Sequence, residues 1–333
     1  NLESKLQSDK NFRQLWNQFN NFETLEVELE WSSDEASRVI GGKILSEYGL
    51  SNKFIIGGSA DLAASTKQII SDNTFGSNNY GGNSIEFGIR EHAMGGIVNG
   101  LALHSKLIPY GSTFLVFSDY MRPSMRLASL MKVNSLFIFT HDSIYLGEDG
   151  PTHQPVEHLM SLRLIPNLDV IRPSNSKELI HSYRYALEKR DNPIAIILSR
   201  QNMKFFDQDL SYKDFQTGAY EFRPGTDITL VATGSEVELA LEISTKLSDF
   251  SVQIISAPIL NRLSEERLES LGLSQNIFTI ELGRTIGWDT YIKNIKKSFS
   301  IDSFGESAPI DQLAEKFNFS AEKISNEIRS LLT

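Results

Sequence analysis

Short apolar segments alternate with amphipathic segments along most of the chain. In the first two thirds, apolar runs of strand length alternate with stretches in which apolar residues recur at helical spacing. This alternation is typical of an α/β fold with a parallel sheet and helices on both of its faces. The predicted strands are 54–56, 113–117, 134–140, 168–171 and 193–199, and the predicted helices are 36–48, 92–103, 120–132 and 175–189.

The first of these helices has sequence signals at both ends. Ser32 and Glu35 form a Ser-x-x-Glu pattern, which is typical of a capping box. Gly49 follows the last apolar residue of the helix, where a left-handed residue often ends it. The preceding residues 1–30 are polar with scattered aromatics, and we expect a lead-in segment with some helix.

The alternation is interrupted once and then resumes. Residues 206–226 are polar and are interrupted by Gly218, Pro224 and Gly225, so we expect a linker there. We therefore expect one domain over residues 31–205 and a smaller α/β domain over residues 227–333. In the second domain the predicted strands are 227–232, 252–256 and 277–281, and the predicted helices are 235–247 and 320–332, with Ser320 as N-cap of the last.

The composition narrows the possible functions. The 333 residues carry a formal net charge of -10, whereas a nucleic-acid-binding protein usually carries a basic patch. The longest apolar runs are about strand length, far short of the roughly 20 residues that span a bilayer. There are no cysteines, which excludes a disulfide framework, a thiolate nucleophile and a Cys-based metal site. We expect a cytoplasmic protein without nucleic-acid or membrane partners.

Polar residues follow three of the predicted strands directly. These residues are Asp61, His141 and Arg200, and if the strands are parallel neighbours they face one edge of the sheet, where ligands of open α/β sheets bind. Taken singly, each could be an ordinary loop residue. His141 and Arg200, together with His153 and Arg38, would form a positive cluster suited to an anion. Arg38 lies in the first turns of a helix, and a solvent-facing position is its favoured interpretation.

The segment 147–155 is an irregular loop with two glycines, two prolines, two carboxylates and a histidine. It matches neither a zinc-binding nor a Walker pattern. A carboxylate and a histidine on a stiff loop suit hydrogen bonding to hydroxyls and proton transfer. Five of the six histidines lie between residues 92 and 158, but for His104, His158 and His181 we favour surface or satisfied core positions.

Glu91 and three aromatic residues allow two interpretations each. Glu91 at a helix start is explained by the helix dipole alone. The alternative is an apolar pocket, where burial would favour its protonated form. Phe114, Phe117 and Tyr120 are spaced by three, so they form either a core stripe or the wall of a pocket for a flat heteroaromatic ring.

Taken together, these segments resemble the C-terminal half of transketolases. The order and spacing of the motifs fit throughout residues 36–310. The loop 148–155 favours transketolases over deoxyxylulose-phosphate synthases and keto-acid dehydrogenases of the same fold. The segments that carry the resemblance are 58–62, 88–95, 109–120, 140–144, 147–155, 199–202 and 231–236.

The resemblance implies transfer of a two-carbon ketol unit from a ketose phosphate to an aldose phosphate, in the pentose phosphate pathway, with thiamine diphosphate as cofactor. Glu91 matches the glutamate that hydrogen-bonds the aminopyrimidine ring of the cofactor. Phe114, Phe117 and Tyr120 match the aromatic pocket around that ring, and Asp61 matches a residue near it. This set is the implied cofactor site of the chain.

The resemblance also implies the substrate site. Asp149 and His153 match residues that bind sugar hydroxyls, and His153 also matches one near the oxygen at the reacting carbon. Glu91 and His153 would therefore be the catalytic residues. The implied ligands of the substrate phosphate are Arg38, Ser65, His141 and Arg200.

Transketolases carry a further domain that binds the diphosphate and Mg²⁺ or Ca²⁺ through a Gly-Asp-Gly motif and an Asn. The 333 residues contain no Gly-Asp-Gly, so we expect the metal ligands outside them and none within. Because the family's active site forms between two chains, we expect a homodimer and an inactive half-site when this chain is alone. Ala64, Tyr145 and Ser112 stand where the family pattern has Pro, Gly and Gly.

Several alternatives remain open from the sequence. The chain, which has no initiating Met, is either an excerpt of a longer transketolase or one subunit of a naturally split enzyme. A non-catalytic paralogue would have lost the glutamate or the phosphate ligands, and these are present. Dihydroxyacetone synthases share the motifs and differ in the acceptor. For the second domain we expect no catalytic residue: its 234–236 turn could bind an anion, but a tight turn is the favoured interpretation.

Overall fold

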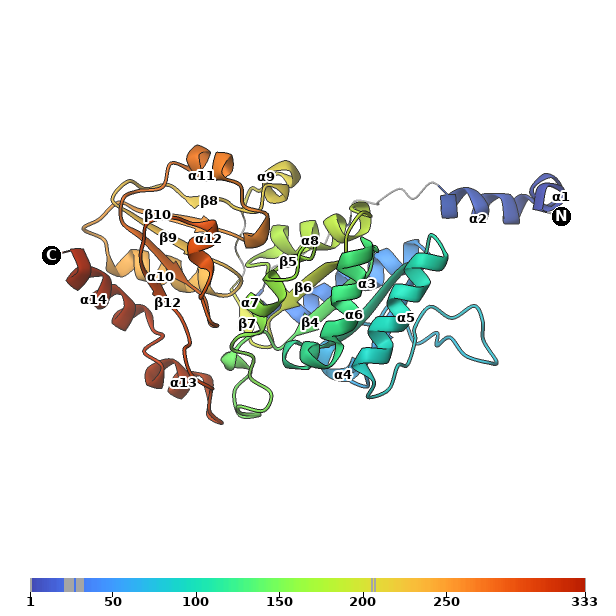
Figure 1. The fold of residues 1–333 in the computed structure, drawn as a ribbon, viewed down its shortest axis with the longest axis horizontal. Coiled ribbons are helices and arrows are strands. Elements are labelled where there is room, and N and C mark those ends of the chain that lie inside the picture. The colour runs from blue at the N-terminus through green and yellow to red at the C-terminus, as the bar shows by residue number, and fades with distance from the viewer. Residues whose placement is uncertain (1, 21–26, 28–32, 205, 207, 333) are drawn as a thin grey trace.

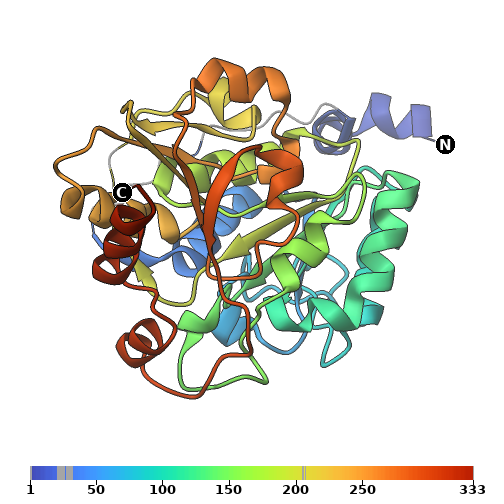
Figure 2. The same cartoon turned by 60° about the vertical axis from the view of Figure 1, so that its left-hand side comes forward.

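The computed structural model describes residues 2–20, 27, 33–204, 206 and 208–332. Two α/β units follow each other along the chain, each built on its own five-stranded sheet. Figure 1 shows the first unit around β4, β5 and β6 and the second around β8, β9, β10 and β12, and Figure 2 shows the same cartoon turned by 60°. The predicted architecture of a parallel-sheet unit followed by a smaller α/β unit is confirmed.

The first sheet has the strand order β2-β3-β4-β6-β5, and its neighbours all pair in parallel. The strands are almost completely buried, because helices cover both faces of the sheet, and this explains their unbroken apolar runs. Its strands are β2 (Ile55–Ser59), β3 (Ile108–Phe114), β4 (Leu136–Thr140), β5 (Asp169–Ile171) and β6 (Ile194–Leu198).

The helices of the first unit divide between the two faces of the sheet. One face forms a core with α3 and α8, through residues such as Ile44 and Tyr183. The other face forms a core with α5, α6 and α7, through residues such as Met94 and Met125. The bounds are α3 (Ser37–Ser51), α4 (Ala63–Thr66), α5 (Glu91–His104), α6 (Ser118–Met131), α7 (His158–Arg163) and α8 (Ser176–Glu188).

The start of the first predicted helix differs from the expectation. Helix α3 begins at Ser37 after Ala36, and Glu35 belongs instead to the short strand β1 (Glu35–Ala36), which pairs antiparallel with β7 (Asn202–Met203). Glu35 is therefore outside the helix and cannot close a capping box; Ser32 lies outside the described residues.

The end of the same helix also differs. The helix continues through Gly49 to Ser51. A Cβ atom at Gly49 would lie 2.4 Å from Cγ2 of Ile70, so this glycine allows close packing rather than ending the helix. The signal was misread because a glycine that permits contact and a glycine that ends a helix look identical in sequence.

Strand β3 was predicted too late in the chain. It covers residues 108–114, and the residues 115–117 form a 3-10 turn. The strand contains Pro109, Gly111 and Ser112, which do not resemble a core strand, yet every residue in it is buried between β2 and β4.

The second sheet has the order β12-β11-β9-β10-β8 and is parallel except for β8, which pairs antiparallel with β10. Strand β8 (Tyr220–Arg223) lies in the predicted linker, and β12 (Ile295–Phe299) was not predicted. Both are edge strands with charged residues, a common protection of exposed edges that weakens the sequence signal. The central strands are β9 (Ile228–Ala232), β10 (Val252–Ser256) and β11 (Ile277–Ile280).

The remaining helices complete the molecule. The last, α14 (Ala321–Leu332), has the predicted N-cap: Ser320 Oγ accepts a hydrogen bond from the Lys323 amide at 3.4 Å. None of the described helices is long and apolar enough to cross a membrane. The other helices are α1 (Leu2–Ser8), α2 (Lys10–Asn20), α9 (Tyr212–Gln216), α10 (Glu236–Lys246), α11 (Glu265–Leu271), α12 (Trp288–Tyr291) and α13 (Ile310–Lys316).

Candidate active site

The three strand-end residues lie at one edge of the first sheet. Because β2, β4 and β6 are parallel members of this sheet, Asp61, His141 and Arg200 all follow its carboxyl ends, as the sequence predicted. Asp61 and His141 have positive φ angles of 62° and 61°, an uncommon conformation for residues other than glycine. The chain thus turns sharply as it leaves both strands, directly at the candidate site.

An apolar cavity of about 850 Å³ opens at this edge. It takes in the N-terminus of α5, the end of β3 and the start of α6, together with one residue of the loop after β4. A cavity of this size and lining is typical of a small-molecule or cofactor site. Its lining residues include Asp61, Glu91, Phe114, Phe117, Tyr120 and His153.

The three aromatic residues form the wall of this cavity and extend beyond the core. The rings of Phe114 and Phe117 are 5.8 Å apart with an angle of 8° between their planes, and those of Phe117 and Tyr120 are 6.0 Å apart at 27°. Phe114 is buried, Phe117 half-buried and Tyr120 exposed. Of the two interpretations of their spacing, the structure favours a pocket wall.

Glu91 is the first residue of α5 and lines the cavity while remaining only 8% exposed. Among the described residues, no hydrogen bond or ion pair to its carboxylate is found. The positive end of the helix dipole favours a carboxylate at this position. A buried carboxylate with unused acceptors is therefore directed at the space beside the aromatic wall.

Next to the cavity, four basic residues come close enough to affect one another. The pKa of His141 is lowered to about 3, first by burial and then by the charges of Arg38, Arg200 and His153. Burial, and then the charge of Arg200, also lowers the pKa of Arg38. The His141 ring is therefore neutral at pH 7, beside two permanent guanidinium charges. Sequence positions 38, 141, 153 and 200 thus form the positive cluster.

His141 is held firmly in place. Its ring stacks on Phe114 with centroids 3.7 Å apart, and its Nδ1 lies 2.8 Å from Thr140 Oγ1. Arg38 is half-buried rather than solvent-facing, and its Nη1 donates to the backbone oxygen of Ser65. The helix start, the end of β4 and the α4 segment therefore meet at this cluster.

The loop 147–155 is fixed by a residue that the sequence did not single out. Gln154 is buried, and its Nε2 donates to the backbone oxygens of Ile144, Gly147 and Glu306 at 3.1, 2.9 and 2.9 Å. His153 on this loop is half-buried, with its ring 5.5 Å from that of Phe117. A buried glutamine has no sequence signature, since only the fold shows which backbone oxygens it reaches.

Not every predicted site residue is brought to the cavity. Asp149 is exposed on the 147–155 loop and is not among the residues that line the cavity. Conversely, Arg90 and His92 line it and were not chosen, although they flank Glu91 in the sequence. Adjacency to a candidate catalytic residue was the signal that could have identified them.

His104, His158 and His181 occupy the surface or hydrogen-bonded core positions that were expected of them. His104 is exposed, and His181 Nε2 lies 2.9 Å from the backbone oxygen of Leu210. His158 is buried with Nε2 3.2 Å from Asp119 Oδ2, and ligand atoms of these two residues and Glu157 lie within 4.8 Å of one another. The two carboxylates are exposed, and pairing with His158 accounts for the arrangement.

Of the three departures from the family pattern, Tyr145 has the clearest structural consequence. Its hydroxyl donates to the backbone oxygen of Phe319 at 3.1 Å and so connects the loop after β4 to the second unit. Ser112 is buried inside β3, and Ala64 lies in the short helix α4.

Two family descriptions match the chain. One, described as the pyrimidine binding domain of transketolase, matches residues 36–205, and the other, described as the transketolase-like C-terminal domain, matches residues 218–320. The curated relatives include transketolases of Staphylococcus aureus strain MRSA252, 41% identical over 317 residues, and Halalkalibacterium halodurans, 40% identical over 310 residues. These alignments cover 91% and 89% of this chain but 48% and 46% of the relatives, so the chain spans about half their length.

Solved structures give the same result. A transketolase from Leishmania mexicana superposes with a TM-score of 0.92 at 32% identity, covering 99% of this chain and 51% of that one. A Pichia stipitis transketolase in complex with sedoheptulose 7-phosphate gives 0.91 at 31% identity, covering 99% and 52%. A split-gene transketolase described as an inactive β4 tetramer gives 0.73 at 25% identity, covering 89% of this chain and 98% of that one.

The matches agree in sequence and in fold. The pyrimidine-binding description alone covers more than half of the chain, and it includes both the cavity and the positive cluster. The chain therefore belongs to the transketolase family.

Proposed function

We propose that this chain supplies the aminopyrimidine side of a thiamine diphosphate site and most of a sugar-phosphate pocket. The complete enzyme would transfer a two-carbon ketol unit from a ketose phosphate to an aldose phosphate, in the pentose phosphate pathway of the cytoplasm. The observation that carries the proposal is one cavity that combines a stacked aromatic wall, an adjacent cluster of basic residues and a buried carboxylate with no partner among the described residues.

The cavity suits the cofactor's pyrimidine ring. The rings of Phe114 and Phe117 are nearly parallel and suit contact with a flat ring, and the cavity of about 850 Å³ is large enough to hold it. The Glu91 carboxylate would hold a proton at a ring nitrogen, and Asp61 and Tyr120 would complete the surroundings of the ring. When bound, the cofactor supplies the carbanion chemistry, while the protein orients it and sets its protonation.

The positive cluster suits the phosphate of a sugar phosphate. The guanidinium groups of Arg38 and Arg200 can each bind phosphate oxygens in pairs. A neutral His141 contributes a hydrogen-bond donor without a further charge, and Ser65 lies beside Arg38. The substrate's phosphate would thus lie at the positive cluster and its reacting end at the cofactor cavity.

The sugar hydroxyls would contact the rigid loop 147–155. His153 lines the cofactor cavity and is also a member of the positive cluster, so it belongs to both. We assign it to the oxygen at the reacting carbon and, with Glu91, to catalysis. Asp149 would bind hydroxyls from the same loop once the substrate fills the space between them.

The other side of the cofactor must come from further protein. In this proposal residues 31–205 are the pyrimidine-binding domain, residues 227–333 together with β8 the C-terminal domain, and a diphosphate-binding domain supplies the Mg²⁺ or Ca²⁺ ligands. That domain would belong to the same polypeptide, as the length of the relatives supports, or to a separate chain, as the split-gene neighbour supports.

The surfaces of helices α5 and α6 indicate that another subunit binds at the mouth of the cavity. Their surfaces carry exposed large apolar side chains in the region that includes the exposed cavity residues. Exposed apolar patches of this kind mark interaction surfaces. We infer that a second subunit covers this face in a homodimer. The exposed residues of the two helices are Ile97, Leu103, Tyr120, Leu127, Leu130 and Met131, and Ile89 lies just before α5.

The test is a ketol-transfer assay with xylulose 5-phosphate, ribose 5-phosphate, thiamine diphosphate and Mg²⁺. We expect activity only when the chain is combined with the diphosphate-binding half, and a loss of at least about 100-fold in Glu91→Ala, the usual scale for a lost proton-transfer group. The control is Glu47→Ala, which removes an exposed carboxylate on α3. Activity of the chain alone, or a fully active Glu91→Ala, would contradict the proposal.

A further inference from the structure

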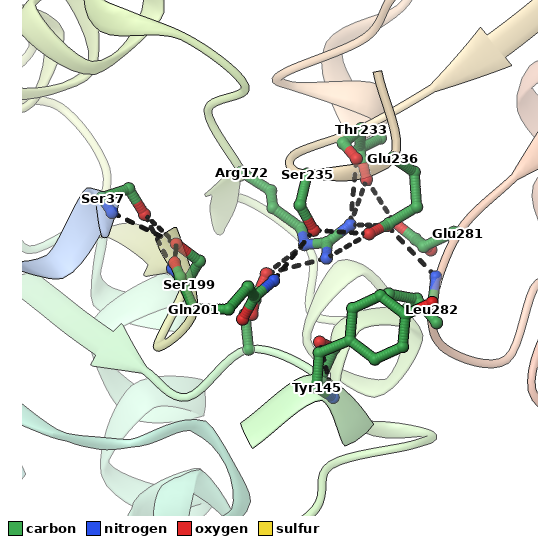
Figure 3. A network of polar contacts seen from close by, with 12 residues as sticks. Ser37, Tyr145, Arg172, Ser199, Gln201, Thr233, Ser235, Glu236, Glu281 and Leu282 are labelled. Atoms are coloured by element: carbon green, nitrogen blue, oxygen red, sulfur yellow. Dashed lines mark hydrogen bonds and ion pairs between the residues drawn. The ribbon is translucent and has the colours of Figure 1, made fainter. Parts of the chain in front are cut away.

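A buried arginine joins the positive cluster to the second unit. Arg172, which follows β5, is 0% exposed. Its Nε and Nη2 donate to Asp142 Oδ2 at 3.0 and 2.7 Å, and Asp142 is the residue after His141. Its Nη1 and Nη2 also bind the carboxylate of Glu236, at the start of α10 in the second unit. Figure 3 shows the Arg172 side chain beside Thr233, Ser235 and Glu236.

A second branch leads from the same glutamate to the end of β6. Ser235 Oγ donates to Glu236 Oε1 at 2.7 Å and accepts from Gln201 Nε2 at 3.2 Å. The backbone oxygen of Gln201 accepts a hydrogen bond from Ser199 Oγ at 2.9 Å. Arg200 therefore lies between two residues that this branch holds.

The branch ends at the start of α3. The amide of Ser199 donates to Ser37 Oγ at 2.7 Å, and the amide of Ser37 donates to Ser199 Oγ at 3.2 Å. Ser37 precedes Arg38 in the chain. Figure 3 shows Ser37 and Ser199 facing each other on the side of the network away from Glu281.

Three of the four proposed phosphate ligands thus share one property. Each of Arg38, His141 and Arg200 is a direct chain neighbour of a residue in this network. The network holds one neighbour of Arg38 and of His141, and both neighbours of Arg200. His141 has the additional constraint of a positive φ of 61°, and such a backbone persists only where its surroundings hold it. The network therefore holds the backbone next to each of these three side chains in place.

The turn of the second unit is shaped to meet Arg172. Gly234 has a φ of 53°, and a Cβ atom there would lie 2.8 Å from three atoms of the Arg172 side chain. The backbone oxygen and hydroxyl of Thr233 each accept from Arg172 Nη1 at 3.0 Å. Only a glycine allows this close approach, so the 233–236 turn and Arg172 fit as a matched pair.

We propose that the 233–236 turn of the C-terminal domain is a positioning element for the phosphate site. The positioning residues are Glu236 in this turn and its partners Arg172 and Gln201 in the first unit. They act on the phosphate ligands through the chain neighbours of those ligands. This inference rests on the proposed function, since it concerns the same phosphate-binding cluster. It assigns the C-terminal domain a role in selecting phosphorylated substrates.

The test uses the holoenzyme assembled with the diphosphate-binding half and compares two acceptors, ribose 5-phosphate and glycolaldehyde, which has no phosphate. In Gln201→Leu with Ser235→Ala we expect KM for ribose 5-phosphate to rise on the order of tenfold, as for residues that couple two sites. We expect kcat and KM with glycolaldehyde to stay unchanged. Arg172→Met should have a larger effect, and the milder double variant keeps the test valid should Arg172→Met fail to fold.

The matched control is Arg262→Met. Arg262 forms another ion pair between the units, with Asp169, and touches none of the chain neighbours of the phosphate ligands. We expect at most a small fall in the melting temperature and no change in the KM ratio of the two acceptors. An equal change of that ratio in Arg262→Met, or an unchanged ratio in Gln201→Leu with Ser235→Ala, would overturn the inference.

A separate variant tests the proposed function beneath it. Arg200→Met removes one phosphate ligand directly and should raise KM for ribose 5-phosphate alone. If it does so while the network variants do not, the phosphate site stands and the positioning role is wrong. If Arg200→Met leaves the KM ratio unchanged, the phosphate site itself is wrong, and the inference is wrong with it.

Discussion

At the scale of single residues, His141 is a neutral ring among cations. Burial and the charges of Arg38, Arg200 and His153 lower its pKa to about 3. Its stacking on Phe114 and its contact with Thr140 hold the ring in place without a proton on both nitrogens. The residue can therefore donate one hydrogen bond to an anion while adding no charge to a site that already holds two guanidinium groups.

This state of His141 predicts a pH dependence of stability. In the unfolded chain the ring takes up a proton near its ordinary pKa of 6.5, whereas in the folded chain it does so near 3. The unfolded state thus binds more protons between these values. The free energy of unfolding should fall by up to about 1.4 kcal/mol per pH unit as pH drops from 6.5 towards 3.

Urea unfolding at several pH values between 4 and 7.5 measures this dependence. Other groups titrate in the same range, so the quantity of interest is the difference between the parent chain and His141→Asn, which should lose this part of the slope. His104→Asn, which changes an exposed histidine, should keep it. Parallel slopes for the parent chain and His141→Asn would contradict the interpretation.

At the scale of elements, the approach of α3 to the α4 segment positions Arg38. A Cβ atom at Gly42 in α3 would lie 2.2 Å from the backbone oxygen of Lys67, just after α4. One turn earlier on the same helix, Arg38 reaches the backbone oxygen of Ser65. Close backbone contact at the glycine is therefore what brings the guanidinium to the positive cluster.

Gly42→Ala should destabilise the chain by about 1 to 3 kcal/mol, because a backbone atom blocks the added methyl group and the core must shift. The matched control is Gly96→Ala in α5, where nothing lies within 4 Å of an added Cβ. That change should stabilise by up to about 1 kcal/mol, because alanine favours a helix. Denaturant unfolding of both variants checks the prediction, and equal effects would refute it.

At the scale of the whole molecule, buried charges join the two units. Arg163 of α7 makes two hydrogen bonds of 2.7 Å with Glu281 of the second unit, and both side chains are 0% exposed. Glu281 also accepts from Thr233 Oγ1 at 2.6 Å, and Thr233 contacts Arg172. The arginines Arg163 and Arg172 thus link the first unit to one connected set of acceptors in the second.

Arg163→Met should therefore lower the free energy of unfolding by about 3 to 5 kcal/mol, because it leaves Glu281 buried without its counter-charge. Adding Glu281→Gln should recover part of this loss, since the amide carries no charge and can still accept from Thr233. Removal of an exposed pair, as in Lys246→Ala opposite Glu322, should barely change stability. Chemical unfolding of these variants tests the prediction, which fails if the double variant is less stable than Arg163→Met.

The pattern of apolar and polar residues was enough to predict the architecture and the main site candidates of the first unit. Strands buried on both faces must be apolar, so their runs are visible without knowing what covers them. Polar residues at the carboxyl ends of such strands share an edge by topology, and this predicts that Asp61, His141 and Arg200 lie together. The resemblance to transketolases added Glu91 and the aromatic wall.

The edge strands and the buried ion pairs, in contrast, depend on which elements pack together in the folded chain. The edge strands β8 and β12 carry charged residues for lack of a neighbour on one side, so their pattern resembles a loop. Arg172 reaches Asp142 and Glu236 across 30 and 64 residues of chain. Local periodicity reports which side of an element is buried, but a buried ion pair depends on which elements are adjacent in space, and only folding brings these together.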